Sequence, residues 1–163
     1  MSKVHVSKEQ ALRSQLIHTL QKSEAHAGFD KAVKGIPEDK MGVRPKGSSH
    51  SAWELLEHIR LAQRDILEFS QSADYVPHKW PDDYWPKSPA PASAAEWTRS
   101  VRAILKDRKT FIALLEDPKR DLFKPFPWGD GQTLLREALL IVDHNAYHVG
   151  EIVLVRQLLG VWK

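Results

Sequence analysis

Three helix-capping boxes divide this chain and restrict its fold more than any other feature. They occupy residues 7–10, 51–54 and 93–96, and each has serine first and Glu or Gln fourth. In such a box, the two side chains satisfy backbone N–H groups that are unpaired at the start of a helix. Apolar residues at helical spacing follow each box, as expected for amphipathic helices. Helices are therefore predicted as the main elements.

Four helices are predicted, the last of them from its apolar face alone. They cover about Ser7–Lys34, Ser51–Ser70, Ser93–Glu116 and a stretch from Gln132 or Thr133 to Gly160. The last would be about 42 Å long at 1.5 Å per residue. Because no credible strand occurs in the 163 residues, the sequence predicts an all-α four-helix bundle that forms a single domain, residues 1–163.

Composition excludes several functional classes. The net charge is only +3, and a basic stripe on the third predicted helix (Arg99, Arg102, Lys106 and Lys109) has no base-reading motif beside it. We therefore expect this stripe to face solvent and expect no nucleic-acid partner. The chain has no cysteine, so a metal would need His or carboxylate ligands. A polar N-terminus and the lack of an apolar run of ~18 residues predict a cytoplasmic protein with no membrane partner.

The connection at residues 71–92 carries five prolines among Tyr75, Trp80, Tyr84 and Trp85. Prolines at this density prevent a helix. So long a loop is uncommon inside one domain unless it packs against the rest of the chain. Two interpretations stay open, an aromatic flap over exposed core or a lid that lines a substrate site.

His144 and His148 lie four residues apart in the apolar fourth helix. This spacing places both imidazoles on one helical face, with side-chain roots about 5–6 Å apart. Two nitrogens at ~2.1 Å from one tetrahedral ion are roughly 3.4 Å apart, which converging rotamers allow. A metal site is one hypothesis. Core histidines that bond to backbone and polar neighbours are the other.

His58 lies beside the apolar stripe of the second predicted helix and is the third candidate ligand. Three imidazoles on two helices suit Zn²⁺, Ni²⁺, Co²⁺ or Fe²⁺ rather than Mg²⁺ or Ca²⁺, and leave an open position for water or substrate. The other histidines have no paired spacing and are expected at the surface: His5, His18, His26, His50 and His78. Of these, His18 and His26 are reserve candidates.

Glu151 shares the face of His144 and His148. It could bond the second nitrogen of a ligand histidine or assist a bound water, or simply pair with solvent or Arg156. A metalloprotease is disfavoured, because the motif His-Glu-x-x-His needs glutamate where this chain has Asn145.

Two stretches resemble the DinB-like (YfiT/DinB) metal-binding four-helix bundles. One is residues 51–59 (SAWELLEHI), and the other joins Thr133 with 143–152 (DHNAYHVGEI) and 156–160 (RQLLG). The resemblance implies an up-down-down-up bundle in which His58, His144 and His148 hold one divalent metal, usually nickel or zinc. Homodimers are frequent in that family, and Gln often stands where this chain has Glu151.

Characterised proteins of that family include bacterial-thiol S-transferases and a mycothiol-dependent isomerase. The resemblance therefore implies a metal-dependent transferase of the small-thiol S-transferase type, or a hydrolase. The substrate would be a small molecule, with a low-molecular-weight thiol as co-substrate. The alternative is a non-enzymatic metal-binding or stress-response module with a structural or sensory ion, and a metal-free structural bundle is the third reading. No catalytic residue is assigned.

Overall fold

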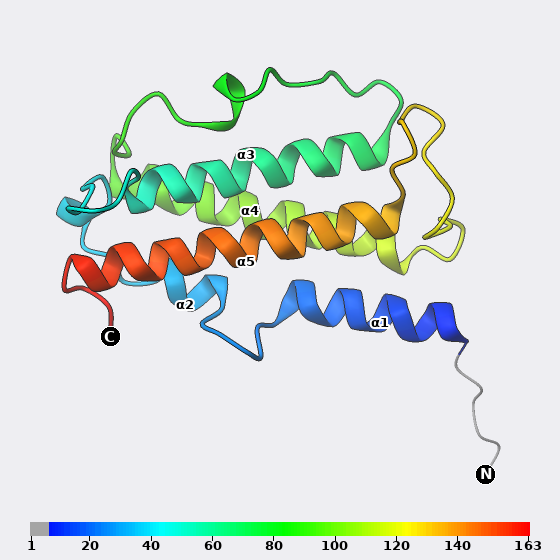
Figure 1. Ribbon diagram of the computed structural model, residues 1–163, viewed down its shortest axis with the longest axis horizontal. Helices are drawn as coiled ribbons and strands as arrows, with labels where there is room; N and C mark the ends of the chain where they lie inside the picture. The colour runs from blue at the N-terminus through cyan, green and yellow to red at the C-terminus, as the bar shows by residue number, and fades with distance from the viewer. Residues whose placement is uncertain (1–6) are drawn as a thin grey trace, which may run out of the picture.

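The computed structural model describes residues 7–163 as an all-helical chain (Figure 1). The elements are α1 (Lys8–Gln21), α2 (Phe29–Val33), η1 (Glu38–Lys40), α3 (Ala52–Gln71), η2 (Asp82–Tyr84), α4 (Ala94–Glu116) and α5 (Leu134–Leu158), where η marks one turn of 3-10 helix. Residues 7–163 contain no strand, only an isolated bridge between Pro125 and Thr133. The predicted all-α class is confirmed, and His5 lies outside the described residues.

The helices form a bundle in up-down-down-up order (Figure 1). α3 packs against both α4 and α5, while α1 contacts α4 and α5 and α2 contacts α5. α1 and α5 run in one direction along the bundle, and α3 and α4 run in the other. Two consecutive helices can be parallel only if the chain returns along the bundle between them. The segment from residue 72 to residue 93, called here the return segment, does this.

The prediction of one continuous helix from Ser7 to Lys34 is wrong. α1 ends at Gln21, Lys22 has an extended backbone, and α2 begins only after Gly28. No large apolar side chain lies between these two helices. A helix that continued through this stretch would bury no large apolar side chain, and most helical stability in proteins comes from the packing of an apolar face. The first helix of the bundle is therefore built from two pieces.

The predicted capping boxes mark helix starts to within one residue. At α3, Ser51 Oγ accepts from the Glu54 backbone N–H at 3.2 Å, and Glu54 Oε2 accepts from the Ser51 N–H at 2.8 Å. The box before α4 is only half formed, because Ser93 caps Glu96 while the Glu96 carboxylate bonds the N–H of Ala92. The helix that carries His58 thus has a fully capped start.

The core consists of two apolar clusters separated by one polar pair. One cluster includes Trp53 and Ile59, and the other includes Leu67 and Phe111. Between them along α3 and α5 lie two amides, Gln63 and Asn145, which bond each other at 2.8 Å. A hydrogen-bonded polar layer therefore crosses the bundle at the level where the fourth predicted helix carries its histidines.

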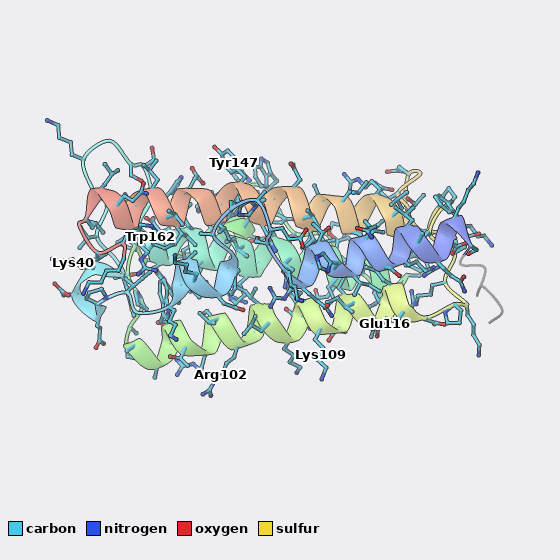
Figure 2. The ribbon with its side chains drawn as sticks, turned by 90° about the horizontal axis from the view of Figure 1, so that it is seen from below. Lys40, Arg102, Lys109, Glu116, Tyr147 and Trp162 are labelled. Carbon is cyan, nitrogen blue, oxygen red and sulfur yellow. The ribbon has the colours of Figure 1, made fainter. Side chains whose placement is uncertain are left out.

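α5 is long and apolar enough to cross a membrane by length and composition, although only 28% of its most apolar window is buried. Core helices of soluble proteins pass the same test, so length and composition alone do not assign α5 to a membrane. On the opposite side of the bundle, the four residues of the predicted basic stripe on α4 are exposed, and Figure 2 shows Arg102 and Lys109 pointing away from the other helices. The exposed position predicted for this stripe is confirmed.

Candidate metal site

Three histidines from two helices meet at one point of the bundle. His58 comes from α3, His144 and His148 come from α5, and one ring nitrogen of each lies within 4.8 Å of the others. The Nε2 atoms of His58 and His144 are 3.1 Å apart. His58 and His148 are buried and His144 is half-buried. The fold therefore brings together the three histidines that the sequence analysis selected.

Two of these rings are held in place by hydrogen bonds from Nδ1 to residues outside the histidine cluster. His58 Nδ1 lies 2.8 Å from the backbone carbonyl oxygen of Tyr84, and His148 Nδ1 lies 2.7 Å from Glu151 Oε2. A carbonyl or carboxylate oxygen only accepts a hydrogen bond, so each Nδ1 must carry the proton and donate. In the neutral rings, Nε2 is then unprotonated and carries a lone pair.

The third ring is oriented by a chain of amides. The backbone carbonyl of Ile104 accepts from Gln63 Nε2 at 2.8 Å, and Gln63 Oε1 accepts from Asn145 Nδ2 at 2.8 Å. Because the carbonyl can only accept, it fixes which way both amides point. Asn145 Oδ1 is left facing His144 Nδ1 at 3.4 Å. Because Asn145 Oδ1 is an acceptor, the proton of His144 is again assigned to Nδ1. This hydrogen bond is longer, and therefore weaker, than those of His58 and His148.

The donor set fits a metal ion. Three unprotonated Nε2 atoms converge, with no proton between them to form a hydrogen bond. Nitrogens that share a tetrahedral ion are roughly 3.4 Å apart, close to the 3.1 Å between His58 and His144. Burial, together with the neighbouring imidazoles, lowers the pKa of His144 and of His148 to about 4. Both are therefore neutral at pH 7, as metal ligands must be, and the cluster is compatible with metal binding.

Glu151 accepts a hydrogen bond from His148 Nδ1, the second nitrogen of that ring, which is one of the roles considered for it. Its pKa is raised by burial, against the opposing influence of His50 and His58. Arg156, the alternative partner, instead donates to the carbonyls of Lys31 and Ala32 and so fastens α2 to α5. A carboxylate on the second nitrogen of a histidine fixes its tautomer and raises its basicity as a ligand.

An aromatic stack covers one side of the cluster. The Trp85 ring lies flat on His58, with centroids 4.0 Å apart and an interplanar angle of 1°. On its other face, Trp85 stacks on His50 at 4.2 Å. By contrast, Trp80 of the same return segment is 68% exposed. The end of this segment therefore lines the histidine cluster. Trp85 also packs against the apolar core, so the structure fits both interpretations of the loop.

Sequence reasoning missed Tyr84 and His50 as parts of this site. The contact made by Tyr84 uses a backbone carbonyl, which every residue type has, so no residue pattern could reveal it. His50 was expected at the surface and is half-buried against Trp85. The reserve candidates do not join the cluster. His18 pairs with Glu24, and His26 bonds the carbonyl of Ala27.

Comparison with protein-family models assigns the chain to a family. Searches of curated proteins and of solved structures found no match. A family model described as the DinB superfamily matches residues 21–152. The matched range includes α3, α4, all three clustered histidines and most of α5. The chain belongs to the DinB superfamily.

Proposed function

We propose that this protein is a metal-dependent enzyme in which His58, His144 and His148 hold one divalent transition metal, zinc or nickel. The observation that supports this proposal is the convergence of three Nε2 lone pairs, each fixed by an acceptor on Nδ1. Nitrogen-only ligands favour zinc or nickel over the oxygen-preferring Mg²⁺ and Ca²⁺. When bound, the ion would lower the pKa of a coordinated water or thiol and so supply a nucleophile near neutral pH.

The proposed reaction is transfer to or from a small thiol, or hydrolysis of a small molecule. The chain has no cysteine, so a reacting thiol must come from a second molecule. Its own residues would orient the ligands, with Tyr84 holding His58 and Glu151 holding His148. Trp85 would keep water from one side of His58. A cytoplasmic location belongs to the same proposal.

Measurement of metal content tests whether the three histidines hold an ion. The protein should be purified without a histidine tag, and bound metal measured by mass spectrometry for wild type, His144→Ala and the control His26→Ala. His26 is exposed and lies outside the cluster. We expect about one ion per chain in wild type and the control, and almost none in His144→Ala. Near-zero metal in all three proteins would refute the proposal.

Cobalt substitution separates an enzyme from a module with a structural or sensory ion. Four-coordinate catalytic sites keep one position for water or substrate, whereas structural sites are closed. Addition of a small thiol to the cobalt protein should therefore change its visible spectrum if the site is catalytic. A spectrum unaffected by thiol would favour the non-enzymatic alternative.

We also propose a homodimer formed through the outer face of α5. Four large apolar side chains on this helix are at least half exposed: Leu139 (52%), Tyr147 (66%), Leu154 (52%) and Leu158 (50%). Figure 2 shows Tyr147 on the outer side of α5. Exposed apolar surface of this kind commonly marks a protein contact. Since Tyr147 also contacts the ring of His148, such a contact would lie next to the histidine cluster.

A further inference from the structure

Asp65 lies on the face of α3 that carries His58, seven residues further along the helix. Seven residues correspond to two turns and about 10.5 Å. Both oxygens of its carboxylate are used, because Oδ1 accepts from the Tyr75 hydroxyl at 2.6 Å and Oδ2 from the Tyr84 hydroxyl at 2.8 Å. The Asp65 side chain is only 15% exposed. It thus anchors the return segment to α3 at two tyrosines.

The tyrosine hydroxyls remain donors over the physiological pH range. Burial, together with the Asp65 carboxylate, raises the pKa of Tyr75 to about 12 and that of Tyr84 further above its ordinary value. Hydrogen bonds to an ionised acceptor are roughly twice as strong as those between neutral groups. The anchor at Asp65 is therefore a pair of charge-assisted bonds that persists at neutral pH.

Tyr84 is attached to α3 at both of its ends. Its hydroxyl binds Asp65, while its backbone carbonyl accepts from His58 Nδ1 at 2.8 Å. The next residue, Trp85, stacks on the His58 ring. The same short piece of chain thus fixes the tautomer of His58 by its carbonyl and the plane of the ring by the indole. Figure 1 shows the return segment running along α3 on the side away from α1.

We propose that Asp65 is a positioning residue for the metal site, which acts on His58 through Tyr84 without touching the ion. Without the anchor, the Tyr84 carbonyl is no longer held in place over His58. The ring then gains the second tautomer, in which Nε2 carries the proton and cannot bind a metal. This inference rests on the proposed metal binding. Tyr75 binds the same carboxylate but has no contact with His58 among the described residues, so it provides a matched comparison.

The test compares wild type, Tyr84→Phe and Tyr75→Phe by two measurements. Nitrogen-15 NMR of the metal-free protein reports the tautomer of His58, and competition with a chelator reports the affinity for zinc. We expect one Nδ1–H tautomer in wild type and Tyr75→Phe, and a mixture in Tyr84→Phe. Zinc affinity should fall about tenfold in Tyr84→Phe, the lower end of the range for outer partners of ligand histidines, and stay at the wild-type value in Tyr75→Phe.

A second variant, Asp65→Ala, must reproduce both changes seen in Tyr84→Phe, with circular dichroism confirming that it folds. A wild-type tautomer and wild-type affinity in Tyr84→Phe would overturn the inference. So would equal losses in Tyr84→Phe and Tyr75→Phe, because these would show only general loosening of the return segment. If wild type binds no zinc but His58 still changes tautomer in Tyr84→Phe, the positioning role stands and the proposed metal function fails.

Discussion

The three histidines differ in the acceptor that holds them: a backbone carbonyl for His58, an amide oxygen for His144 and a carboxylate for His148. A hydrogen bond to a carboxylate is charge-assisted and roughly twice as strong as one between neutral groups. The contact to His144 is the longest of the three, at 3.4 Å. Single-residue changes should therefore affect the site unequally, most of all at Glu151.

Replacement of Glu151 should weaken metal binding without unfolding the protein. Glu151→Ala removes the acceptor from His148 Nδ1, and loss of such a partner typically lowers metal affinity by about 10- to 100-fold. Glu151→Gln keeps an oxygen that can accept and should lose less. Chelator competition with zinc measures both variants, and the exposed Glu116→Ala serves as control. Equal affinity of Glu151→Ala and wild type would show that Glu151 does not support the ligand.

The three histidines of the cluster could be selected from sequence, but the groups that hold them in place could not. His144 and His148 are four residues apart in an apolar helix, and His58 lies beside the stripe of a capped helix, so residue type and spacing identify all three. The acceptors that orient His58 and His144 come from a backbone carbonyl and from an amide in the polar layer. These depend on how the return segment and the helices pack, which no local pattern encodes.

At the scale of elements, the start of α3 carries a half-exposed ion pair, between buried Glu54 and exposed Arg44, that no helix pattern predicts. Glu54 is 5% exposed, and both of its carboxylate oxygens bind Arg44, which precedes the helix. Burial alone would raise the pKa of Glu54, but the bonds to Arg44 and Ser51 outweigh it and lower the pKa below the ordinary value of 4.5. Glu54 therefore joins the preceding loop to the helix that carries His58.

The stability that Glu54 adds should be lost in acid. Because its pKa is lower in the folded state, the ionised carboxylate favours folding above pH 4.5, and this contribution disappears as pH falls through the folded-state pKa. Wild type should be more stable than Glu54→Gln at pH 7, and the difference should shrink below pH 4.5. Urea unfolding at pH 7, 5 and 3.5 measures it, with Glu116→Gln as control. A difference that does not vary with pH would contradict the ion-pair explanation.

The first helix shows why element boundaries are harder to predict than helix faces. The apolar residues at helical spacing after the first capping box correctly indicated a buried face, and Leu16 and Leu20 of this face are in the core. No proline marks the break after Gln21. The chain there is a polar stretch without large apolar side chains that a helix could bury. α2 has five residues, too few for an isolated helix, and depends on Arg156 of α5 for its attachment. Tertiary packing therefore sets these boundaries.

At the scale of the whole molecule, the outer face of α5 predicts self-association. Leu154→Glu places a charge in the centre of the exposed apolar residues and should disrupt a dimer. Analytical ultracentrifugation should find twice the chain mass for wild type and the single-chain mass for the variant. Val76→Glu is the control, since Val76 is 76% exposed and lies outside α5. A wild type that sediments as a monomer at high concentration would rule out this interface.

Metal binding should stabilise the whole bundle, because the ligands come from both α3 and α5. An ion that binds only the folded chain adds about 2.7 kcal/mol when its free concentration is 100 times its dissociation constant. Zinc should therefore raise the midpoint of thermal unfolding in wild type, and a chelator should reverse the shift. His144→Ala should show neither response, since two remaining imidazoles bind weakly. An equal shift in both proteins would place the zinc effect elsewhere on the chain.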